Sequence, residues 1–167
     1  DERIRYAVGS YRPDNHRSQK IRTGQNTLIL DCYNANPSSM QASLVNFRQE
    51  PLEGCTRKIL ILGDMLELGG MSAPAHEELG RQAAEAGLTA LVTYGPEAAR
   101  TAKAAKDAGL ADVVHAEDYQ QAADALLARM APGDALLVKA SRGMHFVAVY
   151  IQEIPSAQSK ILGVSLL

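Results

Sequence analysis

The chain has 167 residues, of which 46% are hydrophobic, and a formal net charge of −2. This length and composition indicate one domain with a substantial core, or one domain with extensions. The nearly balanced charge argues against general attraction to nucleic acid or anionic membranes, and no apolar run approaches the ~20 residues of a membrane-spanning helix.

The first part of the chain is predicted to lead into a strand, a polar elbow and a helix. Residues 4–8 have the pattern of a strand, and the charged segment 9–26 is typical of a solvated loop. The apolar run 28–30 then predicts a buried strand that stops at Asp31. Pro37 fits the first position of a helix, where its missing N–H costs nothing.

The elbow between that strand and that helix combines polar side chains with unpaired helical N–H groups. Asn36 stands at the cap position, and Tyr33 and Asn34 lie between it and Asp31. A helix N-terminus favours anions, so this arrangement is compatible with an anion site. The alternative is that Asp31 and Asn36 only satisfy backbone groups, a common use of both residue types in turns.

Strands and helices alternate through the rest of the chain. Strands are predicted at 58–62, 88–94, 112–115 and 135–139, and helices at 74–86, 97–108, 119–130 and from Ser141 to about 154. This alternation predicts an α/β domain with a mostly parallel sheet, spanning residues 1–154. Residues 155–167 show no clear pattern and are assigned to a tail of uncertain structure.

In sheets of this kind, ligands bind beyond the carboxyl ends of the strands. The turn after the last predicted strand carries two cations and a hydroxyl, from Lys139, Ser141 and Arg142, where a carboxylate or phosphate can dock. The alternative is a lysine whose stem lies along the strand end while its ammonium stays in water. Four predicted strand ends carry groups capable of chemistry: Asp31, Asp64, His115 and Lys139.

Several familiar motifs are absent from the sequence. It contains neither GxGxxG nor GxxxxGK[ST], the usual means of holding a dinucleotide or a triphosphate. The four histidines and two cysteines, Cys32 and Cys55, have no metal-ligand spacing, so no metal site is predicted. His76 is predicted to have a structural role at the start of a helix and no catalytic role. The charged first residues lack the apolar segment of a signal peptide, and a cytoplasmic protein is expected.

Four motifs between residues 15 and 144 resemble those of the Mur ligase family, and within it the ligases that add D-alanyl-D-alanine. In chain order they are NHRSQ, LILDCYNANPSSMQASL, ILGDMLELG with HEELG after it, and VKASRGM. One departure is Ala140, where the family usually has Gly, and the added methyl group narrows that turn.

The resemblance implies a Rossmann-like, three-layer C-terminal domain, without the family's N-terminal UDP-substrate domain and central ATPase domain. Such ligases use ATP and Mg²⁺ to phosphorylate UDP-MurNAc-tripeptide, and D-alanyl-D-alanine attacks the acyl phosphate. The C-terminal domain closes over the central one. The resemblance therefore implies nucleotide and dipeptide contacts, but no catalytic residue here, no cofactor bound to this chain alone, no activity of the chain alone, and a monomer.

By motif position, the resemblance assigns Arg17, Asp31 and Tyr33 to the nucleotide. It assigns the substrates to Asn34, Asn36, Asp64, Lys139, Ser141 and Arg142, with Glu67 as a further candidate.

Two alternatives stay open. Another Mur-type ligase that adds a different amino acid would share the fold but not YNANP. A phospho-receiver signalling domain also sets carboxylates and a lysine at strand ends, but it needs an adjacent acidic pair that this sequence lacks near its first strand.

Overall fold

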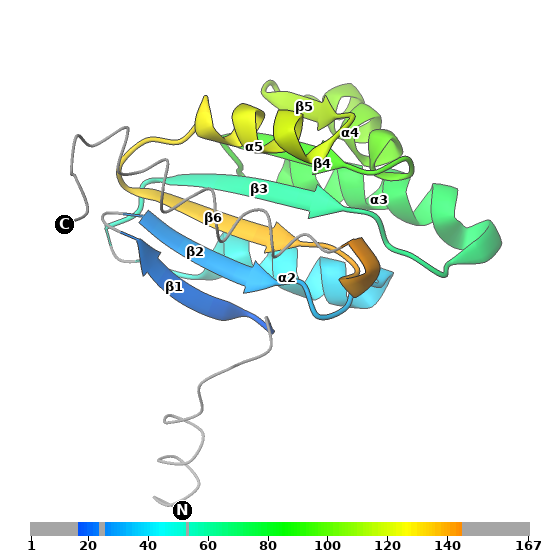
Figure 1. The fold of residues 1–167 in the computed structure, drawn as a ribbon, viewed down its shortest axis with the longest axis horizontal. Helices are drawn as coiled ribbons and strands as arrows, with labels where there is room; N and C mark the ends of the chain where they lie inside the picture. The colour runs from blue at the N-terminus through cyan, green and yellow to red at the C-terminus, as the bar shows by residue number, and fades with distance from the viewer. Residues whose placement is uncertain (1–16, 24–25, 53, 145–167) are drawn as a thin grey trace, which may run out of the picture.

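The computed structural model describes residues 17–23, 26–52 and 54–144. These residues form one sheet with the strand order β1-β2-β6-β3-β4-β5 (Figure 1). β1 runs antiparallel to β2, and the other neighbouring strands are parallel, so the predicted mostly parallel sheet is confirmed. The strands are β1 (Gln19–Thr23), β2 (Asn26–Asp31), β3 (Arg57–Gly63), β4 (Ala90–Tyr94), β5 (Val113–Ala116) and β6 (Asp134–Lys139).

Helices cover both faces of the sheet, which gives three layers (Figure 1). They are α2 (Pro37–Gln49), α3 (Ser72–Glu85), α4 (Ala98–Asp107) and α5 (Tyr119–Leu127), with short 3-10 turns η1 (Gly69–Met71) and η2 (Arg142–Met144).

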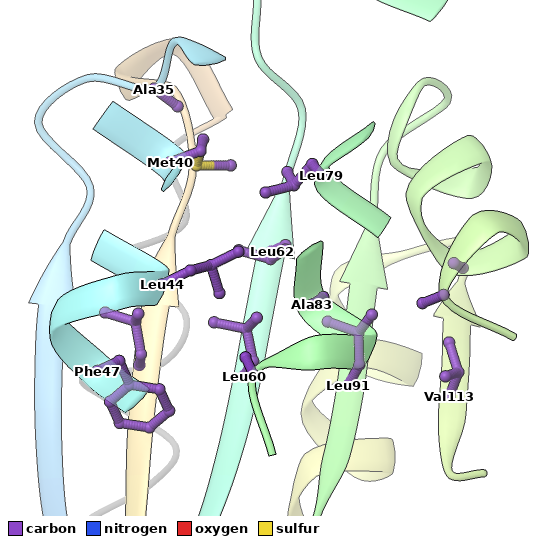
Figure 2. Packing of buried hydrophobic residues seen from close by; sticks show 14 of the residues in the cluster. Ala35, Met40, Leu44, Phe47, Leu60, Leu62, Leu79, Ala83, Leu91 and Val113 are labelled. Atoms are coloured by element: carbon purple, nitrogen blue, oxygen red, sulfur yellow. The ribbon is translucent and has the colours of Figure 1, made fainter. Parts of the chain in front are cut away.

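Side chains that alternate along the strands build a separate core on each face. On one face, Met40 and Leu44 of α2 and Leu79 of α3 pack toward Leu60 and Leu62 of β3 (Figure 2). The opposite core is lined by the intervening strand residues and by α5, and its members include Leu28, Leu30, Ile59, Ile61, Ala122, Leu126, Leu136 and Val138. A sheet buried on both faces explains why its strands are nearly continuous apolar runs.

The position of β6 brings three loops together. β6 lies between β2 and β3, and its last residue, Lys139, is in register with Asp31 on one side and Leu62 on the other. The carboxyl ends of these three strands therefore share one edge of the sheet, which we call the carboxyl edge.

Most predicted elements are present, and the largest shift at a helix end is at α5, which ends at Leu127 rather than at 130. The prediction of a continuous loop over 9–26 is wrong, because Gln19–Thr23 form strand β1. The helix predicted from Ser141 is described only as far as the 3-10 turn Arg142–Met144. The strand predicted at 4–8, the rest of that helix and the tail 155–167 lie outside the described residues.

Candidate functional site

The elbow after β2 is held by its own side chains. The Asn36 Oδ1 accepts the N–H of Ser39 at 2.9 Å, and the Ser39 Oγ accepts the N–H of Asn36 at 3.1 Å. This reciprocal capping box begins α2. The Asn34 Oδ1 accepts the N–H of Ala35 at 2.8 Å. The capping role considered for Asn36 is thus confirmed, and the elbow is a fixed element of the carboxyl edge.

Asp31 and Lys139 form an ion pair at the ends of two neighbouring strands, with the lysine buried and 14% of the Asp31 side chain exposed. The Lys139 Nζ lies 2.8 Å from the Asp31 Oδ2 and 3.0 Å from the carbonyl oxygen of Asn34. Ser43 of α2 donates to the same Oδ2 at 2.6 Å, and the N–H of Ser18 donates to the Oδ1 at 3.3 Å. Only 2% of Lys139 is exposed, so the alternative of a lysine with its ammonium in water is wrong.

Tyr33 projects from the elbow and is flanked by two arginines. The Arg17 Cζ lies 3.6 Å from the centroid of the Tyr33 ring, and the Arg142 Cζ lies 5.8 Å from it. Tyr33 is 38% exposed, and both arginines are exposed. Stacking on the ring orients a guanidinium while leaving its N–H donors available. The result is an exposed cationic rim, made by Arg17, Tyr33 and Arg142, that can bind an anion.

Ser141 joins three loops of the carboxyl edge. Its Oγ accepts the N–H of Leu66 at 2.9 Å and donates to the carbonyl oxygen of Ala35 at 3.4 Å. Its own N–H donates to the carbonyl oxygen of Asp64 at 3.1 Å. The hydroxyl is buried between the β2–α2 elbow and the loop after β3, so the backbone of both loops is fixed relative to β6.

The structure therefore gives different neighbours to the three side chains that the sequence grouped at one anion site. Lys139 faces Asp31, Ser141 faces the backbone of two loops, and Arg142 lies near the ring of Tyr33. Only Arg142 of the three is exposed. The group that the structure does bring together at the surface combines Arg142 with Arg17, which comes from the other end of the described chain.

Asp64 and His76 lie in a buried network beside the site. The Asp64 Oδ1 accepts the N–H of Ala98 at 2.7 Å at the start of α4, and burial raises the pKa of this carboxyl. The fully buried His76 accepts the N–H of Met65 at its Nε2 at 3.0 Å, and its Nδ1 lies 2.8 Å from the carbonyl oxygen of Ser72. The predicted structural role of His76 is confirmed.

Glu67 and His115 are the two remaining candidates from the sequence. Glu67 is exposed in the loop after β3, where its backbone has a φ of 64°. His115 lies on β5, where its Nδ1 is 2.9 Å from the Thr93 Oγ1 of β4, and burial lowers its pKa. The strand order separates His115 from β2 and β6, so it does not share the surroundings of Asp31.

Sequence reasoning missed Ser18 and Ser43, the two serines that hydrogen-bond to Asp31. Ser43 lies three residues after Met40 and four before Phe47, both buried residues of α2, so its place beside the sheet was readable from the helical spacing. Ser18 has no such signal, because its position depends on β1. Both serines line a cavity of about 490 Å³ that also includes Asp31, with Ile29, Phe47 and Leu137 among its apolar lining residues.

Among the residues that the structure describes, no group of three His, Cys, Asp or Glu side chains could hold a metal ion. In the same part of the chain, no helix has both the length and the apolar character to cross a membrane.

Residues 16–142 match the family model for the Mur ligase, glutamate ligase domain. The chain therefore belongs to the Mur ligase family, which confirms the family predicted from the motifs. The family match does not support the phospho-receiver alternative.

Relatives with assigned functions match most of this chain. The chain is 37% identical over 134 residues to the UDP-N-acetylmuramoyl-tripeptide–D-alanyl-D-alanine ligase of Bacillus subtilis, covering 80% of this chain and 29% of the relative. It is 33% identical over 144 residues to the enzyme of the same name from Treponema pallidum, covering 86% of this chain and 30% of that relative. The chain thus spans less than a third of the length of these relatives.

Solved structures agree with the sequence relatives. The MurF ligase of Thermotoga maritima in complex with ADP superposes with a TM-score of 0.76 at 25% identity, covering 93% of this chain and 34% of that one. MurF from Acinetobacter baumannii gives a TM-score of 0.79 at 25% identity, covering 92% and 33%. The fold predicted from the motifs is confirmed.

Proposed function

We propose that the chain is the C-terminal domain of a ligase that joins D-alanyl-D-alanine to UDP-MurNAc-tripeptide with ATP and Mg²⁺, through an acyl phosphate. The names of the relatives and the YNANP and LGDMLELG motifs support this reaction. In this proposal a UDP-substrate domain and an ATPase domain supply the tripeptide site, the P-loop and the Mg²⁺ site. The C-terminal domain closes onto them in the cytoplasm of a bacterium.

The observation that carries the proposal is the cationic rim of Arg17, Tyr33 and Arg142 beside the carboxylate of Asp31. A surface guanidinium such as that of Arg17 can bind phosphate oxygens in a fork geometry, and a carboxylate can accept a hydrogen bond from a ribose hydroxyl. The site therefore fits ATP, which supplies the phosphoryl group when it is bound. The ADP in the related Thermotoga maritima structure supports this choice of ligand.

The dipeptide is proposed to enter beside the nucleotide, at the turn after β6. Ser141 and Arg142 of that turn, together with Asn34 and Asn36 of the elbow, are its proposed contacts. Arg142 brings a positive charge for the free carboxylate of the dipeptide or for the acyl phosphate. Asp64 and Lys139 have less support as substrate ligands, because each is 2% exposed and their polar atoms already bond to protein groups. The Ser141 hydroxyl also bonds to protein groups, so its proposed contact requires exchange of its long 3.4 Å bond to Ala35.

The test is a steady-state assay of the complete ligase that contains this chain, with Arg17→Ala. Loss of a charge-assisted hydrogen bond should raise the KM for ATP about tenfold, while the KM for D-alanyl-D-alanine changes little. Arg81→Ala is the control, because Arg81 pairs only with the exposed Glu78 on α3 among the contacts described. An unchanged KM for ATP with a normal kcat would remove Arg17 from the site.

The same assay tests the whole assignment. The wild-type ligase should form product with D-alanyl-D-alanine and not with single amino acids. Product formation only with another amino acid would favour the alternative, a different Mur-type ligase.

A further inference from the structure

Lys139 carries a buried positive charge at the carboxyl edge, and protein groups already satisfy it. An ammonium has three N–H donors. Three acceptors lie near Nζ: the Asp31 Oδ2 at 2.8 Å, the Asn34 carbonyl oxygen at 3.0 Å and the Asp31 carbonyl oxygen at 3.5 Å. With 2% of the residue exposed, an anionic ligand would have to displace these partners to reach it.

The two oxygens of the Asp31 carboxylate have different surroundings. The Oδ2 accepts from both Lys139 and Ser43, at 2.8 and 2.6 Å. The Oδ1 accepts one long bond, 3.3 Å, from the N–H of Ser18. Ser18 directly follows Arg17, the arginine that stacks on Tyr33. The Oδ1 thus retains acceptor capacity on the side of the cationic rim, and the Oδ2 anchors the group.

We propose that Lys139 is a positioning residue for the nucleotide, acting through Asp31, and that it is not a ligand of the dipeptide. Its ammonium fixes the carboxylate so that the Oδ1 is presented to a nucleotide hydroxyl. It also ties β6 to the elbow through the carbonyl oxygen of Asn34. This inference rests on the nucleotide-binding role proposed for Asp31.

The strand register explains why a lysine can act in this way. Asp31 and Lys139 are paired residues on neighbouring parallel strands, so their side chains leave the same face of the sheet. A largely buried ion pair is costly to disrupt, because removing one partner leaves the other charge without its counter-charge in a site with little water. Without Lys139 the carboxylate would turn or take up water, and its orientation toward the nucleotide would be lost.

The main test measures ADP affinity by calorimetry in the complete ligase with Lys139→Met. We expect ADP binding to weaken about tenfold, the size expected for loss of a charge-assisted interaction, and the KM for D-alanyl-D-alanine to stay nearly unchanged. Lys58→Met is the matched control, because the Lys58 Nζ binds the carbonyl oxygens of Phe47 and Arg48 at the far end of α2. It should lower stability without changing ADP affinity.

A double-mutant cycle separates positioning from a general structural effect. In a ligase that already carries Asp31→Asn, adding Lys139→Met should weaken ADP binding little further. Additive losses, or a rise confined to the KM for the dipeptide, would overturn the inference. If Lys139→Met does not fold, the ADP affinity of the Ser43→Ala variant tests the proposal instead. This substitution removes the other bond to the Oδ2 and should weaken ADP binding by a smaller factor, and unchanged binding would refute the proposal.

These outcomes are distinct from a failure of the proposed function. A wild-type enzyme that does not use D-alanyl-D-alanine would refute the proposed reaction. The ADP titrations of the Lys139 and Asp31 variants would still decide whether Lys139 positions Asp31.

Discussion

Ser141 is the residue at which the two loops of the carboxyl edge meet the end of β6. Its hydroxyl uses one donor and one acceptor position within the protein, toward Ala35 and Leu66. A hydroxyl has a single O–H donor, and an ionised carboxylate can only accept, so the donor is the part of Ser141 that a carboxylate needs. In the closed enzyme that we propose, the hydroxyl would exchange its long 3.4 Å bond to Ala35 for a carboxylate of the dipeptide.

Ser141→Ala in the complete ligase should therefore raise the KM for D-alanyl-D-alanine by about one power of ten and leave the KM for ATP nearly unchanged. Because the Leu66 N–H also loses its partner, the variant should be about 1 kcal/mol less stable. Steady-state kinetics with each substrate varied in turn measures the first effect, and denaturant unfolding measures the second. A shift confined to the KM for ATP would place the dipeptide elsewhere.

At the scale of elements, α3 and α4 pack closely because Gly80 has no side chain. A methyl group built on Gly80 would lie 2.4 Å from the carbonyl oxygen of Thr101 and 2.7 Å from the Cβ of Ala104. Both helices also hold the loop after β3 by hydrogen bonds. His76 of α3 accepts the N–H of Met65, and the N–H of Ala98 in α4 donates to Asp64. Separating the helices would therefore disturb the loop that contacts Ser141.

Gly80→Ala is expected to destabilise the protein by about 1–3 kcal/mol, the usual cost of overpacking. Chemical denaturation of this variant and of the wild type measures the difference in the free energy of unfolding. Gly70→Ala is the control, because a methyl group there meets no atom within 4 Å. Equal stability of the Gly80 and Gly70 variants would show that the helices can move apart without cost.

The element that the sequence did not predict is β1. Its residues, QKIRT, contain one apolar side chain and two cations, a composition typical of a solvated segment. Charged side chains are also common on edge strands, where they oppose unwanted pairing, and local pattern cannot separate the two cases. The buried strands and most helices were predictable because their apolar spacing is regular.

The missed strand also limited the prediction of the site. Asp31, Tyr33 and Arg17 were named from motif positions, but their contacts depend on the direction of β1. Because β1 is antiparallel to β2, the residues before β1 lie beside those that follow β2. This reversal puts Arg17 on the ring of Tyr33. The pairing of Lys139 with Asp31, across 108 positions, likewise depends on strand order rather than on local sequence.

On the scale of the whole molecule, the described residues have a core on each face of the sheet, which is what an independently folding domain requires. We expect the 167-residue chain to unfold cooperatively by circular dichroism. We also expect it to release no phosphate from ATP with UDP-MurNAc-tripeptide and D-alanyl-D-alanine, since its sequence has no P-loop. Turnover by the chain alone would contradict the proposed division of labour between domains.

The central position of β6 has a consequence for the order of assembly. β6 is the last strand in the described chain, yet it separates β2 from β3. During synthesis the residues of β1 to β5 emerge before those of β6, so the inner edges of β2 and β3 lack their native partner until β6 has been made. Long-range strand pairing of this kind is slow to form. Asp31 can pair with Lys139 only once β6 lies between β2 and β3, so the contacts that hold the Asp31 carboxylate depend on this long-range strand pairing.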